Sequence, residues 1–203
     1  FVDVKTNNIQ IEINSLFNDD KLLELDVQTF KSPIQDFKMN YKDSDKKVSI
    51  FGKELIVSEV NFLDENEFEF DDINLNIEVE EIKIGGMKFS SPQIKFIKSS
   101  GVFEKIFVDL QGENDFYKIV LDDEDNIKNF SLESNYIPGL LKIFDFDLNI
   151  SRGSIKIEGK KNKSSDEYDG VIAGKNIVFF DAPFFANFFS IFSLEGFAQK
   201  LKD

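Results

Sequence analysis

Strict alternation of apolar and polar residues constrains the fold of this chain more than any other feature of its sequence. Its clearest example lies between residues 71 and 96, where four aliphatic residues alternate with asparagine and glutamate: Ile73, Leu75, Ile77 and Val79. Successive side chains of a β-strand point to opposite faces, so the pattern predicts a strand with one apolar and one polar face. Ile82 and Ile84 continue the alternation after two adjacent glutamates, and this change of phase predicts a β-bulge.

The same alternation recurs along most of the chain. It occurs near residues 9–13, 23–29, 106–110, 117–121, 130–134, 146–150 and 155–157. Turn signals separate these segments, and the Gly85-Gly86 pair is typical of a hairpin. Many short strands at such spacing predict a mainly β protein with an antiparallel sheet, sandwich or barrel. Alternation alone leaves open whether the apolar face closes a core or lines an open surface.

Two segments depart from the strand pattern. Residues 138–144 predict a short helix with Pro138 near its start, and residues 183–201 predict two more, with Pro183 in a first turn and Ser193 as an N-cap. Five phenylalanines would form one broad aromatic face there: Phe184, Phe185, Phe188, Phe189 and Phe192. We favour packing of this face on the end of the sheet. Contact with lipid is the alternative, although the polar face lacks the lysines that interfacial helices carry.

Composition excludes most catalytic and metal-binding chemistry. The 203 residues include no histidine, cysteine or tryptophan, which removes thiol nucleophiles, imidazole relays and thiolate or imidazole metal sites. The net charge of −14 (24 − 38) would repel phosphate backbones, so no nucleic-acid partner is predicted. The longest uncharged run, residues 182–194, is shorter than the roughly 20 residues of a membrane-spanning helix. We therefore expect a non-enzymatic chain without cofactor or metal.

Charged clusters are the remaining candidates for a polar site. Residues 43–45 and 122–125 lack the aspartate spacing and distal glutamate of a calcium loop, so both are interpreted as solvated turns. Glu78 and Glu80 would share the polar face of a strand, and nothing in the sequence would raise the pKa of one of them for glycosidase chemistry. The lysines of residues 160–163 are interpreted as a solvated loop.

Four segments near the C-terminus occur in a distinctive order. Residues 136–144 contain Gly-Leu-Leu, residues 148–159 contain Arg-Gly-Ser, residues 168–173 contain a glycine-bounded turn, and residues 177–197 contain Ala-Pro followed by Ser-Leu-Glu-Gly. This order resembles the AsmA-like superfamily, in particular its large YhdP-like members, which are related to TamB. Arg152-Gly153 stands where that family often has two glycines, and phenylalanine often replaces its leucine. The resemblance covers about a third of the chain, and the first 130 residues agree with it only as strand repeats.

The resemblance implies an elongated, twisted antiparallel β-sheet curled into an apolar groove. It also implies intermembrane phospholipid transport by a periplasmic protein that is anchored in the inner membrane of a Gram-negative cell. Because the chain begins at Phe1 rather than methionine, we expect a segment of a longer protein. Residues 1–203 would form one β-groove unit, with strand repeats over 1–135 and strands plus a helical pair over 136–203. Phospholipid acyl chains would be its partner, and its oligomeric state is left open.

The predicted lining of the groove consists of sixteen aliphatic residues on alternating strands. They are Leu23, Leu25, Val27, Ile73, Leu75, Ile77, Val79, Ile106, Val108, Leu110, Ile119, Leu121, Leu148, Ile150, Ile155 and Ile157. The five phenylalanines of residues 184–192 are expected to pack on this groove. The rival hypothesis is a non-catalytic interaction domain or adhesin-like β-sandwich with a closed core. Phospholipid that co-purifies with the protein would favour the groove.

Overall fold

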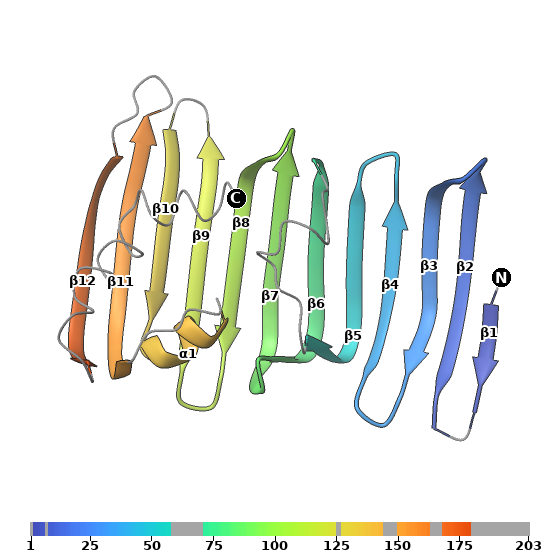
Figure 1. The fold of residues 1–203 in the computed structure, drawn as a ribbon, viewed down its shortest axis with the longest axis horizontal. Helices are drawn as coiled ribbons and strands as arrows, with labels where there is room; N and C mark the ends of the chain where they lie inside the picture. The colour runs from blue at the N-terminus through green and yellow to red at the C-terminus, as the bar shows by residue number, and fades with distance from the viewer. Residues whose placement is uncertain are drawn as a thin grey trace.

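The chain forms one long, open β-sheet whose strands follow each other in sequence order (Figure 1). The computed structural model describes residues 2–6, 8–57, 71–124, 127–143, 150–162 and 168–179. The strands are β1 (Val2–Lys5), β2 (Gln10–Asn18), β3 (Lys21–Lys31), β4 (Asp36–Lys42), β5 (Lys47–Val57), β6 (Ile73–Ile84), β7 (Met87–Ser99), β8 (Val102–Gln111), β9 (Phe116–Glu124), β10 (Ile127–Ser134), β11 (Ile150–Asn162) and β12 (Tyr168–Phe179). One helix, α1 (Ile137–Ile143), follows β10.

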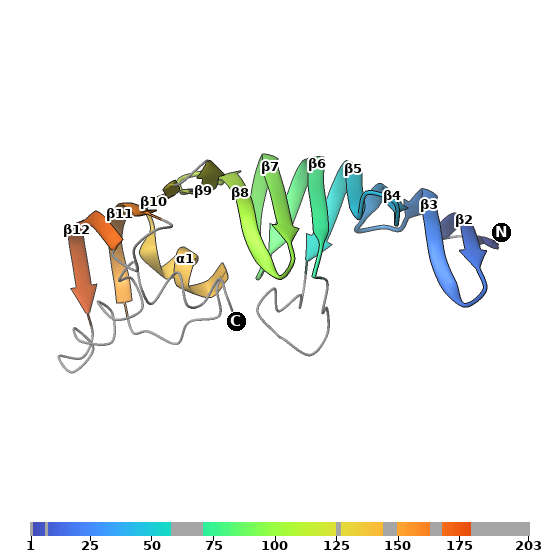
Figure 2. The same ribbon diagram turned by 90° about the horizontal axis from the view of Figure 1, so that it is seen from above.

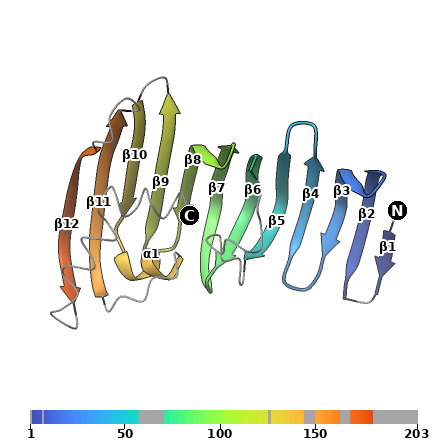
Figure 3. The ribbon, with the colours of Figure 1, turned by 45° about the horizontal axis from the view of Figure 1, so that its top comes forward.

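The sheet is elongated across its strands and does not close into a barrel. Figures 2 and 3 show a single curved layer with β1 at one end and β12 at the other, and with α1 against one face. The predicted mainly β, elongated fold is thus confirmed. The predicted helix over 138–144 is confirmed as α1, whereas the predicted helical pair over 183–201 lies outside the described residues. Among the described residues, no helix is long enough and apolar enough to cross a membrane.

The prediction of a wholly antiparallel sheet is wrong at one position, because β5 and β6 run parallel. Val48 lies opposite Leu75, and Ile50 lies opposite Ile77. Parallel neighbours need a crossover of a dozen or more residues, and residues 58–72 between these strands are long enough to supply one. The parallel pairing keeps the apolar residues of β5 and β6 beside one another on the same face.

The change of phase predicted in β6 is confirmed, but its backbone cause differs from the predicted bulge. Val79 and Ile82 are both buried, with Glu80 exposed between them. The neighbouring β7 changes phase at the same level, since Phe89 and Pro92 are both buried there and Ser91 has a φ of 48°. Both strands therefore bend together at this level, which we call the crease, and no shift of register arises between them. The irregularity passes instead to the pairing of β7 with β8.

Gly52 allows the same crease to pass through β5. Its φ is 155°, and a Cβ at this position would lie 2.5 Å from the carbonyl oxygen of Asp36 and 2.6 Å from the Cα of Phe37. Phe37 lies opposite Gly52 and stacks on Phe30, with ring centroids 4.9 Å apart. A glycine is required here because the backbone of β4 occupies the space that any side chain would fill.

Substitution of this glycine should destabilise the N-terminal half of the sheet. We expect Gly52→Ala to lower the free energy of unfolding by about 2 to 4 kcal/mol, from backbone overlap together with an unfavourable φ. Gly101→Ala is the matched control, because Gly101 also has a positive φ, 78°, but no atom lies within 4 Å of its Cβ position. Urea titration should give a loss of about 1 kcal/mol for that variant. Equal losses for the two variants would contradict the role of the close approach.

Candidate functional site

A row of apolar side chains crosses the whole sheet without interruption. Each strand contributes one residue, and each residue lies directly opposite the next in the register of the pairing strands. The row consists of Val2, Ile13, Val27, Met39, Ile50, Ile77, Ile94, Val108, Ile119, Leu132, Ile157 and Ile172. We call it the central apolar row. Directly opposed side chains lie about 4.5 to 5.5 Å apart, so each member can contact the next.

A second apolar row runs beside the first on the same face. Its members lie two residues from those of the central row, and the two-residue period of a strand places them on the same side of the sheet. From β3 to β10 they are Leu25, Tyr41, Val48, Leu75, Phe96, Ile106, Leu121 and Phe130. The row ends in Gly159 on β11 and Gly170 on β12, where no side chain extends it.

The exposure of the central apolar row changes along the sheet. Val2 on β1 is 52% exposed, and Ile13 and Met39 are half-buried. By contrast, Ile77 on β6 is 3% exposed and Leu132 on β10 is fully buried. Val27 on β3 is the exception, at 6% exposed. Apart from Val27, the row is more accessible over β1 to β5, and it is closed over β6 to β11, where every member is buried.

Helix α1 covers one end of the closed part. Its Ile137, Leu140 and Leu141 are buried in the same apolar cluster as Ile150 and Ile155 of β11. Pro at the start of the helix lacks an N–H that would have no partner in the first turn, and Lys142 in the last turn suits the negative end of the helix dipole. This short helix is thus held by packing on the sheet rather than by its own propensity.

Tyr117 of β9 fixes the position of α1. It is fully buried, its ring meets that of Phe89 edge to face at 5.6 Å, and its hydroxyl donates a hydrogen bond to the Asp115 carboxylate at 2.5 Å. A Cβ at Gly139 of α1 would lie 1.8 Å from the hydroxyl oxygen, so glycine allows the helix to approach this closely. Burial, together with the hydrogen bond to Asp115, raises the pKa of Tyr117 far above its usual value.

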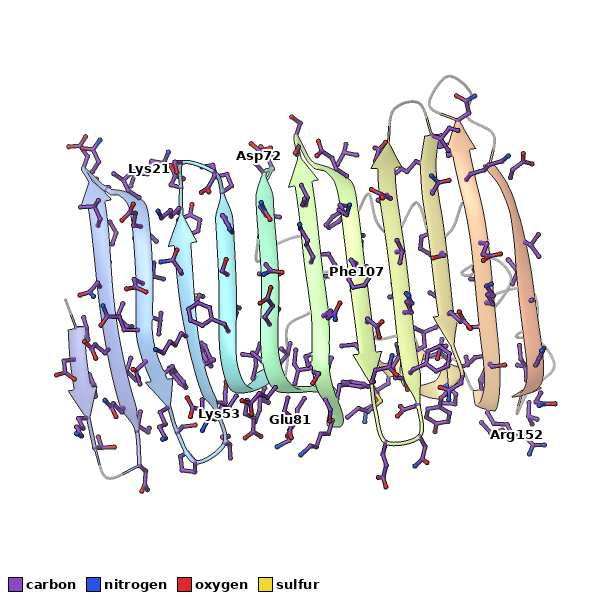
Figure 4. The ribbon with its side chains drawn as sticks, turned by 180° about the vertical axis from the view of Figure 1, so that it is seen from behind. Lys21, Lys53, Asp72, Glu81, Phe107 and Arg152 are labelled. Carbon is purple, nitrogen blue, oxygen red and sulfur yellow. The ribbon has the colours of Figure 1, made fainter. Side chains whose placement is uncertain are left out.

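The opposite face of the sheet is polar and carries cross-strand ion pairs (Figure 4). Lys83 of β6 contacts Glu54 of β5 at 2.6 Å, and Lys105 of β8 lies 3.5 Å from Asp122 of β9. The hydrogen bond to Glu54 raises the pKa of Lys83. Such exposed pairs contribute little to stability, but they keep this face hydrated and distinguish it from the apolar face. Phe107, labelled near the middle of Figure 4, is an aromatic exception on it.

No family model, curated protein or solved structure matches this chain. The resemblance to the AsmA-like superfamily therefore stays a prediction. The two apolar rows and the differences in their exposure are the features of the structure that bear on function.

Most of the predicted lining residues share the apolar face. Eleven of them belong to one cluster or pack against it: Leu75, Ile77, Val79, Ile106, Val108, Leu110, Ile119, Leu121, Ile150, Ile155 and Ile157. Leu25 and Val27 belong to the two apolar rows. Leu23 lies at a register shift of β3, and Ile73 lies opposite Lys98, so neither joins a row. Leu148 and the five phenylalanines of residues 184–192 lie outside the described residues.

The predicted lining omitted several members of the apolar face. Seven residues complete the central row: Val2, Ile13, Met39, Ile50, Ile94, Leu132 and Ile172. A second group lies beyond the crease, where the apolar phase changes: Leu55, Ile82, Ile84 and Phe89. Only the paired change of phase in neighbouring strands places these residues on the same face.

The acidic turn around Asp43 is already neutralised within the chain. Its carboxylate contacts Lys21 at 2.7 Å, pairs with Lys46, and accepts a hydrogen bond from the Tyr41 hydroxyl at 3.0 Å. These hydrogen bonds, first from Lys21 and then from Lys46, hold the pKa of Asp43 well below its usual range. Within the described ranges, no three or more acidic residues are grouped so that they could hold a metal ion. The interpretation of residues 43–45 as a turn therefore needs no bound cation.

Proposed function

We propose that this chain binds phospholipid acyl chains along its apolar face. As part of a longer, inner-membrane-anchored periplasmic protein, it would pass phospholipid between the inner and outer membranes. The central apolar row supports this proposal, since it continues through all twelve strands. An acyl chain on the accessible part of the row would cross no polar side chain between neighbouring strands.

The dimensions of the row suit an acyl chain. Neighbouring strands are about 4.8 Å apart, so twelve strands place the ends of the row about 50 Å apart along the sheet. One leaflet of a bilayer core is about 15 Å thick, which corresponds to about three strand spacings. Each methylene removed from water would contribute about 0.8 kcal/mol, so a chain needs contact along only part of the row to be held.

The more accessible part of the apolar face, over β1 to β5, is where acyl chains would bind first. Met39 and Ile50 of the central row are half-buried there, and Tyr41 and Val48 lie beside them in the second row. The net charge of −14 favours projection of an anionic headgroup away from the protein into water. Recognition would therefore depend on the acyl chains, and the weak affinity this implies suits a protein that must release its lipid.

A pair of neighbouring substitutions on β5 tests the proposal. Ile50→Glu places a carboxylate within the central apolar row, whereas Ser49→Glu places the same group on the opposite face. Protein purified from bacterial cells should carry phospholipid in native mass spectra and solvent extracts. We expect Ser49→Glu to retain that lipid and Ile50→Glu to lose most of it, at unchanged far-ultraviolet circular dichroism.

Transfer is measured separately, with fluorescent phospholipid in donor and acceptor vesicles. Wild type and Ser49→Glu should accelerate exchange, and Ile50→Glu should not. Absence of phospholipid from the folded wild-type protein would sink the proposal and favour the closed-core interaction domain. Bound phospholipid without any exchange would retain the binding surface but remove transport.

A further inference from the structure

Strand β12 presents the longer of the two edges of the sheet. No described strand pairs with its outer side, and β1 at the other end has only four residues. Unpaired N–H and C=O groups on an edge strand are a template for another strand, and proteins usually protect such edges with proline or several charges. The twelve residues of β12 contain no proline and only two charged residues, Asp169 and Lys175.

The two charges of β12 are placed symmetrically about the central apolar row. The pairing of β12 with β11 is regular from Tyr168 to Lys175, and Ile172 is the last member of the row. Asp169 and Lys175 each lie three residues from Ile172, so alternation places both on the face opposite to it. Antiparallel pairing of two β12 strands about Ile172 would set Asp169 of each copy opposite Lys175 of the other. Gly170 would then face Gly174.

We propose that two copies of this chain associate through β12, in antiparallel register centred on Ile172. The contact is isologous, so it closes after two copies. It would join the two central apolar rows through their Ile172 residues and make one apolar face across twice twelve, or 24, strands. This association does not depend on lipid binding.

Charge and burial select this register over its neighbours. Directly opposed residues of two strands share a face. A shift of one copy by a single residue would therefore place its apolar face on the other side, and only shifts by two residues keep both apolar faces together. Centring on Val171 would set Asp169 opposite Ala173, and centring on Ala173 would set Lys175 opposite Val171. The register about Ile172 pairs both charges and also covers Val171 with Ala173 of the second copy. Val171 is 67% exposed, more than any other large apolar side chain in the described ranges.

The carboxylate of Asp169 remains available for this contact. Among the described residues it forms an ion pair with Lys160 at 4.0 Å, and the side chains of Asp169 and Lys160 are 85% and 62% exposed. So long and exposed a pair holds Asp169 only weakly. The opposing lysine of a second copy could therefore join or replace Lys160.

Reversal of the two charges tests the register. Sedimentation velocity over a concentration series should show a dimer of the wild-type chain. Asp169→Lys and Lys175→Asp each set two like charges opposite one another, and each should weaken dimerisation by at least about tenfold. The double variant Asp169→Lys/Lys175→Asp restores both pairs and should restore the dimer. Lys95→Asp, an equal charge change at an exposed position of the inner strand β7, should leave the dimer unchanged. A monomeric wild type, or a double variant as weak as the single ones, would overturn the proposal.

A crosslink locates the two-fold axis. The chain has no cysteine, so Ile172→Cys introduces the sole thiol, and a directly opposed pair lies within the Cα separation of a disulfide. Mild oxidation should give a covalent dimer of Ile172→Cys. The control is Val4→Cys, at an exposed position of the edge strand β1. This variant should remain monomeric on a gel run without reducing agent. A crosslink of Val4→Cys alone would place the contact on the wrong edge, and a crosslink that forms only when the Val4→Cys and Ile172→Cys chains are mixed would indicate head-to-tail pairing of β12 with β1.

Discussion

Replacing Leu132 with aspartate is expected to abolish the folded state of the C-terminal half of the sheet. Leu132 is fully buried between Ile119 and Ile157 of the central apolar row. Loss of its packing alone costs about 2 to 5 kcal/mol, and an ionised carboxylate there adds a desolvation penalty of several kcal/mol. A typical domain has a total stability of about 5 to 15 kcal/mol. Far-ultraviolet circular dichroism and soluble yield should show the loss directly.

The same substitution elsewhere in the row should be tolerated. Met39 is only half-buried, so Met39→Asp should leave the protein folded and lower its free energy of unfolding by less than about 2 kcal/mol. Leu132→Met conserves volume and controls for disturbance of the site, with an expected loss below about 1.5 kcal/mol. If Leu132→Asp stayed folded while it lost bound lipid, the closed part of the face would also be open to ligand. If Met39→Asp unfolded as well, the difference in exposure along the row would carry no energetic meaning.

Local pattern predicted which segments form strands, because the alternation of side chains is a property of each strand by itself. The segment from Ile73 to Val79 forms part of β6 with its aliphatic residues on one face, as its sequence indicates. Helix α1 was predicted for a similar reason, from a break in alternation and a proline near its start. These are short-range signals, and no contact between distant residues is needed to interpret them.

Register and strand direction could not be predicted in the same way. Both depend on the connections and on irregular residues, such as Gly52 in β5 and Ser91 in β7, that shift the apolar phase. The parallel pairing of β5 with β6 is one such case, since a connection of this length permits either direction. Since the central apolar row needs eleven correct pairings in succession, one unrecognised bulge would break it in any prediction from sequence.

The residues of the apolar face divide in the same way into those that local pattern predicts and those that it does not. Residues such as Ile77 and Val108 were placed on the apolar face by alternation alone, whereas Met39 and Ile50 were missed because their strands are shorter or interrupted. The difference in exposure between the two halves of the face has no signal in the sequence. Over β9 to β11 it includes the contact of α1 with Tyr117, a contact between segments that alternation does not relate.

Truncation of Tyr117 should have the second large effect. Tyr117→Ala removes a fully buried ring that packs against Phe89 and Gly139, and we expect a loss of about 3 to 5 kcal/mol. Because the ring also supports α1, proteolysis of the native protein should then cut near the helix. Tyr117→Phe keeps the ring and removes the hydroxyl, so it should cost only about 1 to 2 kcal/mol through the lost hydrogen bond to Asp115. Equal losses for the two variants would mean that the hydroxyl, not the ring, holds this part of the structure.

The hydroxyl of Tyr117 also predicts how stability depends on pH. Burial raises its pKa in the folded state above the unfolded value of about 10, so the folded protein retains this proton where the unfolded chain releases it. The contribution is fully present below about pH 10 and is lost as pH rises beyond it. Tyr117→Phe lacks the titrating group, and its free energy of unfolding should fall less steeply above that pH than that of the wild type. Tyr41→Phe is the comparison, since burial also raises the pKa of Tyr41 but that side chain is only half-buried, and its slope should differ from wild type less than that of Tyr117→Phe. Parallel slopes for wild type and Tyr117→Phe would contradict the prediction, because they would show that the hydroxyl ionises alike in the folded and unfolded states.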